Sequence, residues 1–114
     1  MPVPLYQAKA EFFRTLGHPA RIRVLELLSD RDHAVHELLD VVDVEPSNLS
    51  QQLAVLRRAG LVTVHRTGGE VVYSLTVPEV RELLLAARSL LLRLLTDQDA
   101  LKGELLGRTL GSPS

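Results

Sequence analysis

Apolar residues in the first sixty positions recur at steps of three and four, the spacing that places them on one face of an α-helix. Gly17 and Gly60 follow two of these stretches and are typical helix stops. Pro19 and Pro46 stand where a proline is tolerated, in the first turn of a helix. The pattern predicts helices over residues 5–16, 19–29, 35–42 and 46–59.

After Gly60 the pattern changes to short runs rich in valine and threonine that alternate with polar residues. Two such runs, 61–66 and 71–76, are separated by Thr67–Glu70, which contains two consecutive glycines. Alternation on both sides of a glycine turn predicts a β-hairpin.

A long helix is predicted from Glu79 onward, and between 83 and 95 leucine occupies nearly every side of it. A helix that is apolar all round must be buried all round, and a chain of 114 residues offers too little protein to cover it. We therefore expect a homodimer. The predicted subunit interface on this helix is Leu83, Leu84, Ala87, Leu90, Leu91 and Leu94.

The length is that of one domain, which we place at residues 1–110 with a frayed tail at 111–114. Hydrophobic residues make up 46% of the chain and charged residues 24%, as in ordinary globular proteins. Cysteine is absent, which excludes disulfides, thiolate metal sites and thiol redox switching. No signal segment or membrane span is recognisable, so a cytoplasmic location is expected.

The net charge of −1 gives no support for nucleic-acid binding by the molecule as a whole. The distribution of charge is more informative. Residues 26–45 form an acidic stretch, whereas the charged residues within 46–75 are Arg57, Arg58, Arg66 and Glu70. Any DNA-binding face must therefore be local.

The order of elements places a short helix and a tight turn directly before a helix with small amide and hydroxyl side chains, as reading of the major groove requires. Amides can form paired hydrogen bonds with adenine, and serine can serve base edges or phosphates. Arginines at the end of this helix and polar residues on the hairpin would hold phosphates or enter the minor groove. The predicted DNA-binding set is Ser47, Asn48, Ser50, Gln51, Gln52, Arg57, Arg58, His65, Arg66, Thr67 and Gly68.

Three stretches resemble the arsenic-repressor (ArsR/SmtB) family of regulators: 15–25 (TLGHPARIRVL), 47–62 (SNLSQQLAVLRRAGLV), and Arg66, Gly68 and 73–75. The similarity covers residues 5–95. It implies a mostly α fold with a β-hairpin wing, in the winged helix-turn-helix order ααααββα(α), where the last helix is optional. It further implies a homodimer built on the first and fifth helices, which adds Leu5, Phe12 and Phe13 of the first helix to the predicted subunit interface. It also implies repression at a palindromic operator in double-stranded DNA and release by an inducer.

The chain departs from this family at the sensor sites. The family's cysteine pair near the third helix is absent, and the fifth helix has no histidine, only Glu79 and Glu82 near its start. His33 and His36 share a helical face but offer only two ligands, so solvated histidines are the expected outcome. No metal or other cofactor is predicted. An apolar effector at the dimer seam and a dimer without any effector both remain open.

The sequence also bears on two alternatives to a DNA-binding regulator. An enzyme is disfavoured, because the sequence contains no paired nucleophile and base, phosphate-binding glycine loop or metal triad. A winged-helix module that binds another protein is the stronger rival, since fold alone does not decide function. Such a module would be expected to expose apolar or acidic residues where this chain has a polar, acid-free face.

Overall fold

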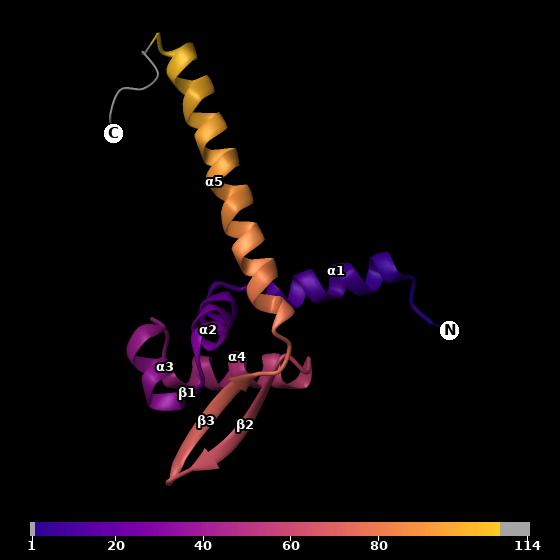
Figure 1. Ribbon diagram of the computed structural model, residues 1–114, viewed down its shortest axis with the longest axis vertical. Helices are drawn as coiled ribbons and strands as arrows, with labels where there is room; N and C mark the ends of the chain where they lie inside the picture. Colours follow the sequence, from indigo (N-terminus) through magenta and orange to yellow (C-terminus); the bar gives the residue numbers. More distant parts are fainter. Residues whose placement is uncertain (1, 108–114) are drawn as a thin grey trace. The chain divides into compact units, whose positions relative to one another are not determined.

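The computed structural model describes residues 2–107, and within that range the chain folds into helices and one small sheet (Figure 1). The predicted tail at 111–114 and residues 108–110 of the predicted domain lie outside the described residues. The elements in chain order are α1 (Leu5–Leu16), α2 (Pro19–Asp30), β1 (His33–Ala34), α3 (Val35–Val41), α4 (Pro46–Arg58), β2 (Val62–Thr67), β3 (Glu70–Leu75) and α5 (Glu79–Leu105). Apart from β1, this is the predicted order.

The predicted start and stop signals act as expected. Nδ1 of His18 accepts a hydrogen bond from the backbone N–H of Ala20 at 3.2 Å, so this histidine caps α2 ahead of Pro19. Gly60, just after α4, has φ +80°, the left-handed conformation in which helices commonly end. The boundaries of the helices therefore follow from local chemistry.

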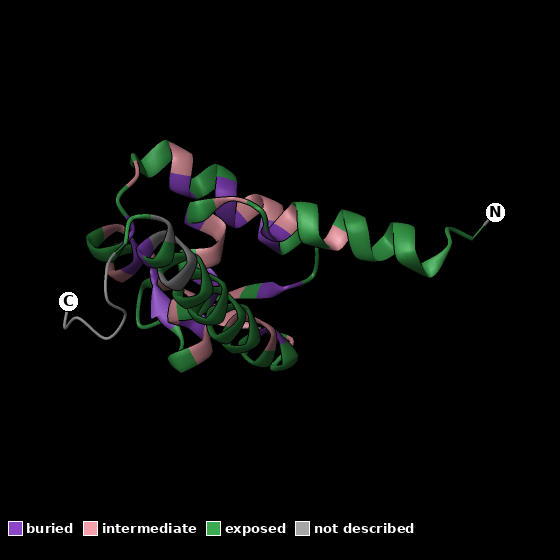
Figure 2. Ribbon diagram, turned by 90° about the horizontal axis from the view of Figure 1, so that it is seen from above, coloured by how far each residue is buried: buried purple, intermediate pink, exposed green. Residues whose placement is uncertain are grey.

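The described residues belong to two compact units, one ending at Arg81 and the other beginning at Glu82. The first unit contains the core, drawn in purple in Figure 2. Leu56 of α4 is fully buried. Helical spacing after Leu56 would place Ala59 on the same inward face, but Ala59 lies beyond the end of α4 and is exposed. Further core residues are Leu16, Val24, Leu25, Leu28, Leu38, Leu49, Leu53, Leu61, Val62 and Val80.

The sheet has the order β1-β3-β2 with antiparallel pairing throughout. Gly68 and Gly69 have φ +56° and +84°, and two central residues with positive φ are what a tight two-residue hairpin turn needs. The strand β1 was not predicted, because two residues are too few to show alternation. It exists because the backbone of His33 and Ala34 pairs with the free edge of β3.

A short network of polar contacts lies at the N-terminal end of α3. The Arg31 guanidinium lies 2.8 Å from a carboxylate oxygen of Glu37, and that carboxylate also accepts the Ala34 N–H at 2.9 Å. The hydrogen bond from Arg31 and then that from Ala34 lower the pKa of Glu37 to about 2. Glu37 therefore supplies the N3 half of a capping box by accepting the N–H of the N-cap residue Ala34, which has no side-chain cap of its own.

A second contact joins α3 to the tip of the hairpin. Nε2 of His36 lies 2.9 Å from a carboxylate oxygen of Glu70, although the two residues are 34 positions apart in the sequence. This hydrogen bond is the main reason that the pKa of His36 lies above its ordinary value. Both side chains are exposed, so the contact is a solvent-screened tether.

The second unit consists, in its described part, of α5 from Glu82 onward. Within the single chain every side chain from Leu85 to Asp99 is exposed, including Leu90 at 60% and Leu91 at 56%. None of the described helices combines the length and the apolar character that a membrane span requires.

Leu56→Ala is expected to lower the free energy of unfolding by about 2–5 kcal/mol, because it leaves a cavity among fully buried neighbours. Urea unfolding followed by circular dichroism at one fixed protein concentration would measure this change. The matched control is Val41→Ala at the exposed end of α3, with an expected change within about 0.5 kcal/mol. Equal effects of the two substitutions would contradict the assigned core.

Glu70→Gln is expected to destabilise the protein at about pH 6 and to have little effect at about pH 9. The pKa of His36 is higher in the folded state than in the unfolded state. Its pairing with Glu70 therefore stabilises the fold fully at a pH below the pKa of the unfolded state. This stabilisation is lost as the pH rises through the pKa of the folded state. Urea midpoints at the two pH values would give the difference, and an NMR titration should show a lower pKa for His36 in the variant. A difference in urea midpoint between wild type and variant that is the same at both pH values would exclude a stabilising contact between His36 and Glu70.

Candidate nucleic-acid interface

The helix α4 has one buried face and one open face. Its buried side consists of Leu49, Gln52, Leu53 and Leu56, which follow one another at three- and four-residue spacing. A four-residue turn, 42–45, connects α3 to α4, and Pro46 at the first position starts the helix directly after it. This is the connection that a helix-turn-helix motif uses to present its second helix.

The open face of α4 carries Ser47, Ser50 and Gln51, all exposed as predicted. Asn48 is half-buried at the edge of this face. The side chains are short or end in amides, and between Pro46 and Leu56 the helix contains no charged residue. A surface of this kind can approach a polar ligand closely without repelling an anion.

Gln52 does not lie where it was predicted. Its side chain is 9% exposed, and its Nε2 donates a hydrogen bond to Oδ1 of Asn48 at 2.8 Å. The prediction of an outer position for Gln52 was wrong because it followed the polarity of the residue. Its angular position, three residues after Leu49 and four before Leu56, would have placed it inside.

The hairpin separates its predicted contact residues between two faces. Side chains alternate along β2, so Arg66 shares a face with Val62 and Val64, whereas His65 and Thr67 point to the other face. Val64 lies opposite Tyr73 in the register, and Tyr73 is therefore on the face of Arg66. Gly68 lies at the exposed turn, between the two strands.

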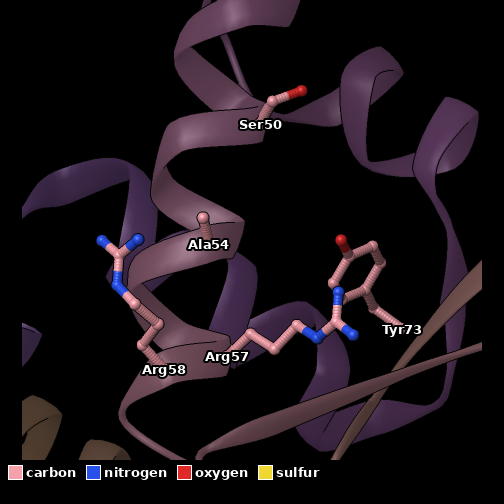
Figure 3. Close-up of a pocket in the computed structure, with 5 residues that line it drawn as sticks. All are labelled: Ser50, Ala54, Arg57, Arg58 and Tyr73. Atoms are coloured by element: carbon pink, nitrogen blue, oxygen red, sulfur yellow. The ribbon is translucent and has the colours of Figure 1, made fainter.

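A hollow of about 410 Å³ lies between α4 and β3. Its lining is Ser50, Ala54, Arg57, Arg58 and Tyr73, shown in Figure 3. Arg57 extends toward Tyr73, and Arg58 projects from another side of the helix. Tyr73 was absent from the predicted site. The alternation of β3, which puts it on the face of Val64, is the signal that could have found it.

The charges around this hollow are positive. Among residues 46–75, Arg57, Arg58 and Arg66 are the cationic side chains, and the carboxylate of Glu70 is paired with His36. The local surface is therefore suited to anions even though the net charge of the chain is −1.

The two histidines considered as metal ligands have separate surroundings. His33 is buried at 7% exposure, with Nδ1 2.9 Å from the carbonyl oxygen of Arg31, so the expectation of a solvated side chain was wrong for this residue. The backbone pairing of β1 with β3 brings it inside. His36 is exposed and contacts Glu70. In the part of the chain that the structure describes, no group of three or more metal-ligating side chains is assembled.

The residues predicted for a subunit interface lie on α1 and on α5. On α1, Leu5 and Phe13 are exposed at 70% and 55%, and Phe12 is half-buried with its ring edge-on to Phe13. On α5, Leu83 and Leu84 are half-buried, and the remaining predicted positions are exposed: Ala87, Leu90, Leu91 and Leu94.

Comparison with known proteins identifies the family. Residues 18–64 match the family described as bacterial regulatory protein, arsR family. The chain is 56% identical over 103 residues to the uncharacterized HTH-type transcriptional regulator Rv0081 of Mycobacterium tuberculosis, covering 90% of each protein. It is 36% identical over 86 residues to the HTH-type transcriptional repressor SmtB of the same species, covering 75% of this chain and 64% of that protein.

The fold comparison agrees. The crystal structure of Rv0081 superimposes with a TM-score of 0.77 at 57% identity, covering 85% of this chain and 98% of the other. The predicted winged helix-turn-helix is thus confirmed, with α4 as the second helix of the motif and the β2–β3 hairpin as the wing. The chain belongs to the ArsR family of bacterial transcriptional regulators.

Proposed function

We propose that this protein binds a palindromic operator as a homodimer and represses transcription there. The observation that carries the proposal is the open face of α4, which is polar, free of acids and bordered by arginines. In this arrangement α4 enters the major groove and the wing lies against the adjacent backbone or minor groove.

Sequence readout is assigned to the outermost residues of α4. Gln51 can pair with the hydrogen-bonding edge of adenine, and Ser47 and Ser50 are short enough to contact base edges or nearby phosphates. Gln52 is left out of this set, because its amide is buried and donates to Asn48. Asn48 keeps a supporting role at the edge of the face.

Affinity is assigned to the cations that flank this helix. Arg57 and Arg58 end α4, and Arg66 lies on the wing face that also carries Tyr73. Each guanidinium can neutralise a phosphate without distinguishing bases. His65, Thr67 and Gly68 lie on the other wing face or at its turn, where they suit contacts with the minor groove or its edges.

A dimer suits both the apolar surface and a palindromic site. The leucines of α5 are exposed in the single chain, and water-exposed apolar surface of this extent marks an interaction site. A two-fold dimer would present two α4 helices to successive major grooves about 34 Å apart. An apolar effector wedged at this seam would change their spacing, which offers a route to release of the operator.

Gln51→Ala is expected to weaken binding to the operator by about 1–3 kcal/mol while binding to random duplex stays nearly unchanged, because the lost contacts are with bases. Fluorescence anisotropy with the protein's own upstream promoter and with random DNA would measure both. Arg58→Ala is the contrasting variant: it should weaken both complexes and reduce the salt slope by about 1. Equal losses on both DNAs for Gln51→Ala would remove it from the readout set.

A wild-type protein with no preference for promoter DNA over random duplex would contradict the proposed function. That outcome would favour the protein-interaction module. Metal ions added to the same titration would show whether the complex responds to them.

Leu91→Glu is expected to shift the protein from dimer to monomer at micromolar concentration, because it places a charge in each half of a buried apolar interface. Sedimentation velocity would detect the change, and operator affinity should fall with it. Val41→Glu is the control, since it places the same charge at an exposed apolar position of α3, outside the predicted interface. A monomeric wild type, or dissociation by both variants, would refute this interface.

A further inference from the structure

Tyr73 is the one polar lining residue of the hollow beside α4 that the DNA-binding residues assigned above leave without a role. It is half-buried in the middle of β3, and its ring extends away from the strand with the hydroxyl at the far end (Figure 3). The other polar groups of the hollow are the Ser50 hydroxyl and the guanidinium groups of Arg57 and Arg58. The lining therefore offers two cations and two hydroxyls, and no carboxylate.

We infer that Tyr73 is a DNA-backbone contact, whose hydroxyl donates a hydrogen bond to the same phosphate that Arg57 neutralises. The phosphate belongs to the strand that passes between the major groove occupied by α4 and the wing. This inference rests on the proposed function and extends it by one residue and one subsite.

The chemistry of the lining matches a phosphodiester. A guanidinium and a hydroxyl are common donors to phosphate oxygens. The phenolic O–H of tyrosine can donate a hydrogen bond to a phosphate oxygen. The hollow of about 410 Å³ is an order of magnitude larger than the volume of one water, about 30 Å³, so it has room for a backbone unit.

The position of Tyr73 is held by the sheet. Its Cα partners are His33 on β1 and Val64 on β2, so the strand is paired on both sides at this residue. A ring held this way loses little freedom when its hydroxyl contacts DNA, which lowers the entropic cost of binding. Arg57, in contrast, is exposed at the end of α4 and can adjust to the phosphate.

The test is Tyr73→Phe, which keeps the ring and removes only the hydroxyl. Affinity for operator and for random duplex should fall by the same factor, about tenfold, because a hydrogen bond to a charged phosphate carries no sequence information. The salt slope should stay unchanged, since no charge is removed. The matched control is Tyr6→Phe, the same chemical change at an exposed position of α1, which should bind like the wild type.

A double-mutant cycle with Arg57→Gln tests whether both residues contact one phosphate. Arg57→Gln alone should weaken both complexes and lower the salt slope by about 1. If the phosphate is shared, the double variant should lose less affinity than the product of the two single losses. Losses that multiply would overturn the shared contact.

Three other results would also overturn the inference. Tyr73→Phe that binds both DNAs as tightly as a DNA-binding wild type refutes the contact and leaves the proposed function intact. A loss confined to the operator would assign Tyr73 to base or shape readout and not to a phosphate. A wild type that fails to bind promoter DNA would overturn the proposed function together with this inference.

Discussion

The packing of α4 by its leucine face is the constraint on which the rest of the structure depends. Leu49, Leu53 and Leu56 are each at most 2% exposed, and their burial decides the rotation of α4 about its axis. Because side chains recur every 3.6 residues, this rotation also decides which polar residues face outward. Ser47, Ser50 and Gln51 are exposed because the leucines are buried, and Gln52 is buried with them.

The burial of Gln52 illustrates how a polar residue can serve the fold next to a binding surface. A primary amide placed among leucines is costly unless it is hydrogen-bonded. Asn48, one turn earlier, accepts a hydrogen bond from the amide nitrogen of Gln52 at the edge of the open face. The polar face of α4 is consequently narrower than its composition indicates, and the remaining side chains carry the readout that we propose.

The wing depends on pairing between segments that are distant in the chain. The short strand β1 covers one edge of β3, and β2 covers the other. The contact between His36 and Glu70 adds a link from α3 to the hairpin tip and pairs the one carboxylate among residues 46–75. A chain of net charge −1 thereby presents a locally positive surface, formed by Arg57, Arg58 and Arg66.

The sequence by itself determined the helices, the hairpin and the location of the polar helix, because periodicity, proline, glycine and capping are local signals. His18 and Gly60 mark helix ends through their own neighbours. Tertiary structure alone decided the burial of Gln52 and His33, the strand β1 and the place of Tyr73 beside Arg57. These depend on how α4 rotates and on which strand edge is free. The physical reason is that pairing and packing join residues tens of positions apart, whose proximity leaves no pattern in a local stretch of sequence.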